Sequence, residues 1–378
     1  QLETNPPIIK LCRGLYEKIL RSQAPVKTST FHAFCQELLR RFPMEANVSP
    51  GFDLLDKTGL LYDEAWQALM VAANKDTELA DALHLLFNEL GLSNAKQALA
   101  SFINHRSDWW AYTADENDTV QYAQQQLQEQ LGIDASVDPV ESFFNDKSNI
   151  TLINEFHVLL CKHETKKNKE VSDAIYKLID DNVKQEEFFT LIKQCFLTKT
   201  GTVLVRKESN VQEKKMGADG QARFLELHEY LSQKIIDTNL ALAAIRTLKT
   251  SSAWYVAGQA YLNHFQKLKS EQRLLDFTDL EWQTYLLLNQ SNNALWIQYK
   301  LDQRIEHLLV DEFQDTNSIQ YRWLKEFVGP QSHIMVVGDD DQSIYSWRGA
   351  QVENIRKFEK DYSATEVVRL EQNYRSTS

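Results

Sequence analysis

The chain has 378 residues, which at roughly 150 residues per domain corresponds to about two and a half domains. Hydrophobic residues make up 43% of the sequence and charged residues 25%, a composition that excludes a disordered or collagen-like chain. Lysine and arginine number 41 against 53 aspartates and glutamates, so the formal net charge is -12. Because phosphate binding needs basic surface, this balance argues against a protein that binds nucleic acid over its whole surface, but it permits a local basic groove.

The sequence has the features of a cytoplasmic protein. No run approaches the roughly 18 consecutive apolar residues of a membrane span, and the N-terminus lacks the pattern of a signal peptide. The four cysteines lie far apart and form no CxxC pair, and they are Cys12, Cys35, Cys161 and Cys195. We therefore expect reduced, buried thiols and neither a zinc site nor a disulfide framework.

One helix is clearly predicted near the N-terminus. Apolar residues recur after Thr30 at helical spacing, from Phe31 to Phe42. Ser29 or Thr30 is expected to cap the start of this helix, and Pro43 is expected to end it.

The middle of the chain, about residues 55–300, is predicted to be mostly helical. Between Gly51 and Gly329 the sequence contains a single proline, Pro139, and its apolar residues recur at helical spacing. Trp109 and Trp110 stand beside Arg106, and such aromatics can stack on bases, but packing in a helical core is the favoured interpretation.

The C-terminal eighty residues predict an α/β arrangement. Continuous apolar runs at 308–310, 334–337 and 367–370 are typical of strands buried on both faces. Helical patterns lie between them, so the order strand, helix, strand, helix, strand indicates a parallel sheet. In such sheets ligands bind at the carboxyl ends of the strands, where the acidic clusters of this chain fall.

The first acidic cluster, Asp311 and Glu312, follows an apolar run directly. A nucleotide-hydrolysing site needs one carboxylate to hold Mg²⁺ and a second to orient or deprotonate the attacking water. Taken alone, the same pattern also fits a strand that ends in a solvated acidic turn.

The second cluster begins at Gly338 and continues with three aspartates from Asp339. Tyr345 and Trp347 follow beside Arg348, a combination that can stack on single-stranded bases. The alternative is an acidic turn with both aromatic rings packed in the core. A third apolar run leads to Arg375, which has the chemistry to contact a γ-phosphate.

These segments together resemble a known family. Residues 311–315 resemble the Walker B motif DExQD of superfamily 1 DNA helicases, and residues 338–350 resemble their GDxxQSIYxWRGA motif. Residues 370–377 resemble the LxxNYRS motif, and residues 29–34 resemble the TxHAF motif that contacts single-stranded DNA. Residues 276–280 resemble the LDFxDL segment of the same proteins, which include UvrD, Rep, AddA and RecB.

The resemblance implies a role for each matching residue. Asp311 would coordinate Mg²⁺, Glu312 would act as general base, and Gln314 and Gln342 would sense the γ-phosphate of ATP. The motif positions that would contribute to the nucleotide site also include Asp339, Arg348, Tyr374 and Arg375. The residues that would contact single-stranded DNA are Thr30, Phe31, His32, Tyr345 and Trp347.

The resemblance also implies the fold: a RecA-like parallel-sheet core of a P-loop NTPase with a large all-helical insertion. Residues 1–55 and 271–368 would form the first RecA-like domain, 56–270 the insertion, and 369–378 the start of a second RecA-like domain. No GxxxxGK followed by Ser or Thr occurs in the sequence, so we expect the chain to be a middle fragment that begins after this motif.

The implied activity is that of an ATP-dependent 3′-to-5′ helicase or translocase of DNA repair or recombination, acting on single strands and duplex junctions. The alternative is a DNA-binding or assembly module without ATPase activity, which the missing P-loop favours. Residues 26–60 look most like AddA, which would imply an AddB-like nuclease partner, whereas the sequence from Asn317 onward looks more like UvrD and Rep. One hypothesis for this change is that the chain is a natural hybrid of the two subfamilies, or that two genes were joined during sequence assembly near residues 310–317.

Overall fold

The computed structural model describes residues 6–22, 26–55, 59–163, 165–179, 185–290, 292–302, 305, 307–326, 333–343, 353–362 and 365–369. The chain divides into two compact units. Unit 1 comprises Gln1–Val71, Ala100–Ala114 and Tyr261–Ser378, and unit 2 comprises Ala72–Leu99 and Asp115–Ala260. Three helices have residues in both units: α3 (Gly59–Ala73), α5 (Leu92–Asn104) and the 54-residue α13 (Ala218–Glu271).

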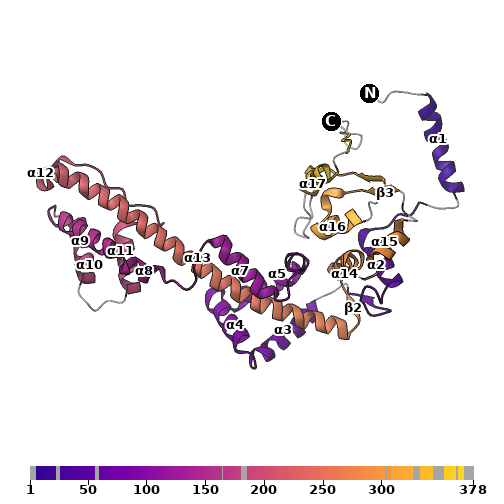
Figure 1. Ribbon diagram of the computed structural model, residues 1–378, viewed down its shortest axis with the longest axis horizontal. Coiled ribbons are helices and arrows are strands. Elements are labelled where there is room, and N and C mark those ends of the chain that lie inside the picture. The colour runs from indigo at the N-terminus through magenta and orange to yellow at the C-terminus, as the bar shows by residue number, and fades with distance from the viewer. Residues whose placement is uncertain are drawn as a thin grey trace. The chain divides into compact units, whose positions relative to one another are not determined.

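Unit 1 combines helices with two pairs of short parallel strands (Figure 1). Its helices are α1 (Pro6–Arg21), α2 (Phe31–Arg41), α3 (Gly59–Ala73), α6 (Arg106–Tyr112), α14 (Phe277–Asn289), α15 (Ala294–Asp302), α16 (Ser318–Glu326) and α17 (Glu353–Asp361). Its strands are β1 (Asp53–Leu54), β2 (Leu274–Leu275), β3 (His307–Val310) and β4 (His333–Val336). Two short 3-10 helices, η1 (Phe313–Asp315) and η2 (Asp340–Gln342), follow β3 and β4.

The two strands that precede the acidic clusters are confirmed. β3 and β4 pair in parallel with Val310 opposite Val336, so their carboxyl ends meet at one edge. The prediction that both faces of these strands are buried is wrong, because Leu309 is 72% exposed and Met335 is 58% exposed. These strands form a two-stranded sheet, and the described residues cover only the face that contains Val310.

The predicted third strand at 367–370 is also wrong for its described part. Residues 365–369 adopt no strand, and Val367 and Val368 are exposed. A strand requires a neighbour with which to pair its backbone N–H and C=O groups, and no described strand lies beside this segment. An apolar run therefore does not form a strand by its composition alone.

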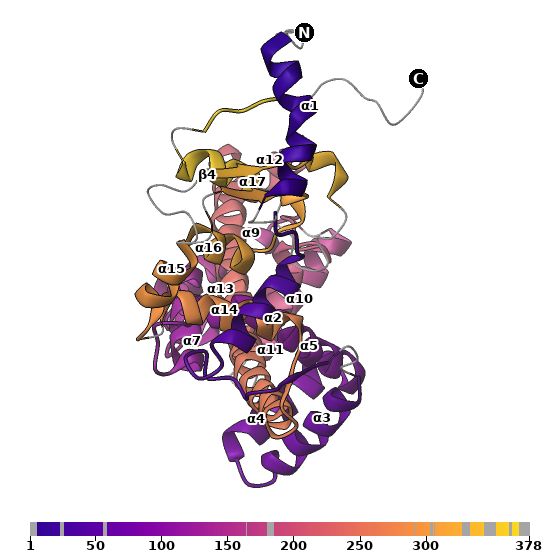
Figure 2. The same ribbon diagram turned by 90° about the vertical axis from the view of Figure 1, so that its right-hand side faces the viewer.

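Helix α2 begins and ends as predicted. Thr30 is its N-cap, and the Thr30 hydroxyl accepts a hydrogen bond from the backbone N–H of Ala33. The apolar stripe of α2 packs on α14 and α16 in the core of unit 1, which also contains Val310 of β3, and Figures 1 and 2 show α17 next to the β3–β4 pair. The largest buried side chains of this core include Phe52, Trp282, Phe313, Trp323 and Phe358.

Unit 2 is built from helices with an apolar core of its own. Its helices are α4 (Thr77–Leu90), α7 (Thr119–Leu131), α8 (Pro139–Asn145), α9 (Lys147–Cys161), α10 (Lys166–Ile179), α11 (Gln185–Phe196) and α12 (Asn210–Met216). Aspartate side chains cap four of these helices, and Pro139 occupies the first turn of α8, where its missing N–H needs no partner. The core includes Phe143, Phe156, Phe189, Phe196 and Phe224.

The cysteine prediction is confirmed in part. Cys35 and Cys195 are buried free thiols, whereas Cys161 is exposed at the last residue of α9 and corrects the expectation. Burial raises the pKa of Cys35 to about 12, so this thiol stays protonated. The side chain of Cys12 lies outside the described residues. In the described part of the chain, no helix has the length and hydropathy that spanning a bilayer requires.

Candidate nucleotide site and its connections

The acidic turn after β3 is held against the end of β4. The backbone N–H of Phe313 donates to the carbonyl of Val337 (2.9 Å), and the N–H of Val337 donates to the carbonyl of Val310 (2.8 Å). Between these bonds Glu312 adopts a left-handed backbone conformation, with φ at 52°. This conformation costs a non-glycine residue about 1 kcal/mol, so the surrounding bonds must hold the turn in place.

The buried side chain of Gln314 stabilises this turn through hydrogen bonds. Its side chain is 1% exposed, and its amide nitrogen donates to the carboxylate of Glu312 (2.7 Å). Its amide oxygen accepts from the backbone N–H of Asp339 (3.0 Å). Gly338 makes this arrangement possible, because a Cβ atom there would lie 2.8 Å from the Gln314 amide oxygen. One buried side chain therefore connects both strand ends with the carboxylate of Glu312.

The turn after β4 is organised by Asp339. One oxygen of its carboxylate accepts from the backbone N–H of Asp341 (3.1 Å), and the other accepts from the side-chain amide of Gln342 (2.6 Å). Gln342 and Asp339 are exposed, at the same edge of the sheet as Asp311 and Glu312. The structure thus brings together five of the predicted site residues: Asp311, Glu312, Gln314, Asp339 and Gln342.

The exposed carboxylate of Asp311 fits the chemistry of a magnesium ligand. Its Oδ1 atom accepts one hydrogen bond, from the backbone N–H of Glu312 (3.0 Å). Magnesium is usually held by one or two carboxylates, while water and substrate phosphates supply its other ligands, so an open strand end with a single carboxylate is sufficient.

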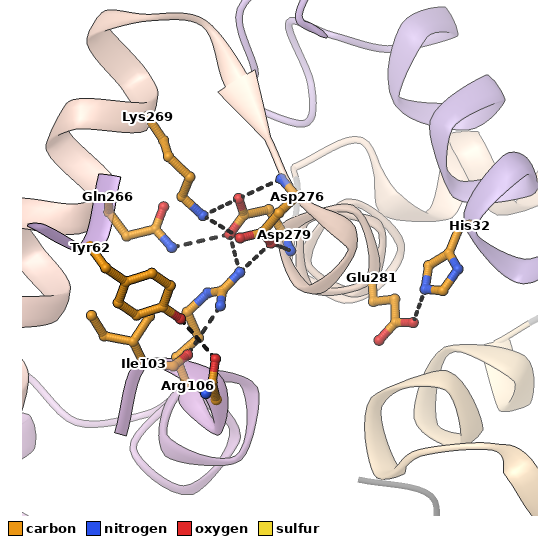
Figure 3. Close-up of polar contacts among 10 residues, drawn as sticks. His32, Tyr62, Ile103, Arg106, Gln266, Lys269, Asp276, Asp279 and Glu281 are labelled. Atoms are coloured by element: carbon orange, nitrogen blue, oxygen red, sulfur yellow. Dashed lines mark hydrogen bonds and ion pairs between the residues drawn. The ribbon is translucent and has the colours of Figure 1, made fainter. Parts of the chain in front are cut away.

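The three residues of the TxHAF-like segment have well-defined contacts. Thr30 caps α2, and the Phe31 ring meets the Trp323 ring edge-on at 5.5 Å between centroids. His32 lies over the Phe277 ring at 4.5 Å, and its Nε2 atom is 2.8 Å from Oε1 of Glu281. Figure 3 shows the His32 side chain directed at Glu281.

Glu281 is a site residue that the sequence reasoning missed. Its carboxylate is buried and is in contact with His32, Asn317 and Gln320. A signal was present, because Glu281 lies on the helical stripe that also contains Leu280, Leu287 and Leu288. A charged residue within an apolar stripe indicates a buried carboxylate that has found partners.

A buried cluster of four charges occupies another part of unit 1 (Figure 3). Asp276 and Asp279 form a reciprocal capping box at the start of α14, and both carboxylates are paired with Arg106 and Lys269. Burial by itself would raise the pKa of Asp279, but the neighbouring Arg106 and Lys269 outweigh it and hold that pKa below its ordinary value. Two cations therefore balance two carboxylates.

The same region decides the interpretation of the paired tryptophans. Trp109 is buried against Phe102, with ring centroids 5.0 Å apart, and Trp110 packs on Trp282 at 5.4 Å. The guanidinium of Arg106 lies 5.6 Å from the Trp110 ring. The core interpretation of these aromatics is confirmed.

Several predicted site residues lie outside the described part of the chain. They are Tyr345, Trp347, Arg348, Tyr374 and Arg375. Their roles stay predictions from the motifs.

Parallel strands that end in a metal-compatible carboxylate and a buried glutamine define a candidate nucleotide-hydrolysing site. Residues 10–363 match the family described as the UvrD/REP helicase N-terminal domain, and the chain belongs to this family. It is 55% identical over 105 residues to DNA helicase II of Haemophilus influenzae, covering 28% of this chain and 14% of that protein. It is 48% identical over 126 residues to DNA helicase II of Escherichia coli, covering 33% and 16%.

A further relative is the ATP-dependent DNA helicase Rep of Escherichia coli, which is 47% identical over 104 residues, or 28% of this chain and 15% of that protein. The aligned part of the chain thus spans 14–16% of the length of these three relatives.

Proposed function

We propose that the chain is part of the motor of an ATP-dependent DNA helicase. The observation that carries this proposal is the buried Gln314 amide, which holds the Glu312 carboxylate at the edge where β3 and β4 end. Membership of the UvrD/REP helicase family supports the assignment of DNA and ATP as ligands.

In this proposal Glu312 accepts the proton of the attacking water, and Gln314 keeps the carboxylate oriented for that step. Asp311 would hold Mg²⁺, which when bound supplies positive charge to the phosphate oxygens of ATP. Asp339 positions Gln342 at the same edge, where the Gln342 amide would contact the γ-phosphate. Arg348, Arg375 and Tyr374 would complete the nucleotide site, with Tyr374 stacked on adenine.

On the DNA side, we assign the single-strand track to Thr30, Phe31 and His32, and base stacking to Tyr345 and Trp347. His32 is 38% exposed at its side chain, so its ring can reach a bound strand while it contacts Glu281. Domain closure around ATP and reopening after hydrolysis would then move the strand past this surface.

We further propose that unit 1 contains part of a RecA-like domain and that the helical block of about residues 56–270 is inserted into it. The direction of movement would be 3′ to 5′, and the role would lie in DNA repair or recombination. If the resemblance of residues 26–60 to AddA reflects the parent protein, an AddB-like nuclease subunit would be its partner.

A second function, DNA binding or assembly without hydrolysis, is favoured by one sequence observation. The 378 residues contain no GxxxxGK followed by Ser or Thr, whose backbone amides and lysine hold the phosphates of ATP.

Steady-state ATP hydrolysis by the full-length protein, with and without single-stranded DNA, separates the two functions. The helicase proposal expects hydrolysis that DNA stimulates and unwinding of a duplex with a 3′ single-stranded tail. DNA binding without any hydrolysis would support the second function instead.

A further inference from the structure

We propose that Glu281 is a positioning residue that couples the nucleotide site to the DNA-contacting start of α2. The inference rests on the proposed function, because it assigns a connection between two parts of that same site. It begins from the three partners of one buried carboxylate, which belong to two different segments of unit 1.

The first connection runs from Glu281 to the start of α16. Asn317 and Gln320 form a reciprocal cap there: the Asn317 side chain accepts from the N–H of Gln320 (2.8 Å), and the Gln320 side chain accepts from the N–H of Asn317 (3.2 Å). Both amide nitrogens point away from this cap and donate to Glu281, at 2.6 Å from Asn317 and 2.5 Å from Gln320. The start of α16 therefore cannot shift without moving Glu281.

The second connection runs from α16 back to the acidic turn. Thr316 is fully buried between η1 and α16, and its hydroxyl donates to the carbonyl of Phe313 (2.7 Å). The side-chain amide of Asn354 donates to the carbonyl of Thr316 (2.9 Å). The four residues that separate Glu312 from Asn317 are thus held by short contacts, so displacement at Glu312 is passed to the cap of α16.

The third connection runs from Glu281 to His32. The carboxylate is 5% exposed, whereas the imidazole is 38% exposed, so one end of this contact is buried and the other faces solvent. His32 is the second residue of α2 and follows Phe31, whose ring packs on Trp323 of α16. A bound strand that moves His32 would therefore move the residue that holds the cap of α16.

A purely structural role would not need a carboxylate here. A buried charge is desolvated at considerable cost, and an apolar side chain of the same size frequently stabilises a fold as well or better. A carboxylate, in contrast, can accept from His32, Asn317 and Gln320 at once, and replacement by an amide removes one acceptor oxygen while the shape is kept.

The test uses Glu281→Gln in the full-length protein, with Glu326→Gln as the matched control. Glu326 accepts from the amide of Gln298 (3.2 Å) and is half-buried, and within the described part of the chain its hydrogen bonds and ion pairs include neither His32 nor the acidic turn. We expect the stimulation of ATP hydrolysis by single-stranded DNA to fall about tenfold in Glu281→Gln, while KM for ATP changes less than twofold. In the Glu326→Gln control, single-stranded DNA should stimulate ATP hydrolysis as much as it does in the parent protein.

His32, whose side chain is 38% exposed, provides a second pair of variants. The Nε2 atom of glutamine can reach Glu281 as that of histidine does, so His32→Gln should keep more DNA stimulation than His32→Ala. If DNA stimulates ATP hydrolysis equally in Glu281→Gln and the parent, or if the two His32 variants lose equal amounts of this stimulation, the inference is overturned while the proposed function stands. A parent protein that DNA does not stimulate would overturn the proposed function and this inference with it.

Discussion

Gln314 holds the carboxylate of Glu312 from the interior of the protein. The bond from its amide nitrogen to Glu312 is 2.7 Å long, and the same amide group accepts from the backbone of Asp339. The resemblance assigns Gln314 to the γ-phosphate, but a side chain that is 1% exposed, with both ends of its amide engaged, is better suited to position Glu312.

Replacing Gln314 with Met should reduce ATP turnover by up to about 10²-fold in the full-length protein, because a base that is misplaced by a fraction of an ångström loses its alignment. Affinity for ATP should change little. The matched control is Gln298→Met, since Gln298 donates to Glu326 in the same way but lies away from the acidic turn. Equal turnover in the two variants would show that Gln314 has no special part in hydrolysis.

Replacing Gly338 with Ala should disturb the same contact from the backbone side. The new Cβ atom would lie 2.8 Å from the Gln314 amide oxygen and 3.2 Å from Cδ1 of Ile355, so the side chain of Gln314 must move. We expect the free energy of unfolding to fall by about 1–3 kcal/mol and turnover to fall with it. Gly59→Ala is the control, because a Cβ atom there meets nothing within 4 Å. Denaturant unfolding of both variants measures the difference.

The sequence predicted the local elements of this site but not the contacts between distant segments. Local residues and apolar spacing are enough to predict the cap at Thr30 and the strands that end at Val310 and Val336. The same holds for the helix that follows each of these strands. The contact of Arg106 with Asp276 joins residues 170 positions apart, and no local pattern predicts it. The buried role of Glu281 likewise becomes evident only when α2, α14 and α16 are brought together.

The errors have a related physical cause. Whether Leu309 and Met335 are covered, and whether residues 365–369 form a strand, depends on which other segments lie beside them. Composition specifies how apolar a run is, but the neighbours that bury or pair it are supplied by the tertiary structure.

The buried charge cluster should make a large contribution to stability. Lys269→Met leaves two carboxylates with one cation in a site where Lys269 is 1% exposed, and we expect a loss of about 3–5 kcal/mol in the free energy of unfolding. Lys267→Met is the control on the same helix. Lys267 is 73% exposed and lies 3.9 Å from Glu271, so its loss should stay below about 1 kcal/mol.

The pH dependence of this contribution follows from the lowered pKa of Asp279. Because the folded protein holds this carboxylate ionised more strongly than the unfolded chain does, the stabilisation is present above the ordinary aspartate pKa of about 3.9 and is lost as the pH falls further. Lys269→Met raises the pKa of Asp279 toward or above that ordinary value, so urea unfolding between about pH 5 and pH 3 should show a shallower loss of stability. Parallel pH profiles for the parent and the variant would contradict the assigned role of Lys269.

The two carboxylates after β3 should have separable functions. Glu312→Gln keeps the size of the side chain and can still contact Gln314, but it removes the basic oxygen, so turnover in the full-length protein should fall by roughly 10²–10⁴-fold while ATP and Mg²⁺ still bind. Asp311→Asn removes charge from the metal ligand, so it should weaken the magnesium-dependent part of nucleotide affinity. Nucleotide titrations with and without Mg²⁺, combined with single-turnover hydrolysis, distinguish the two effects. If Glu312→Gln hydrolyses ATP at the parent rate, the acidic turn is only the solvated end of a strand, and the bond from Gln314 stabilises the turn without orienting a base.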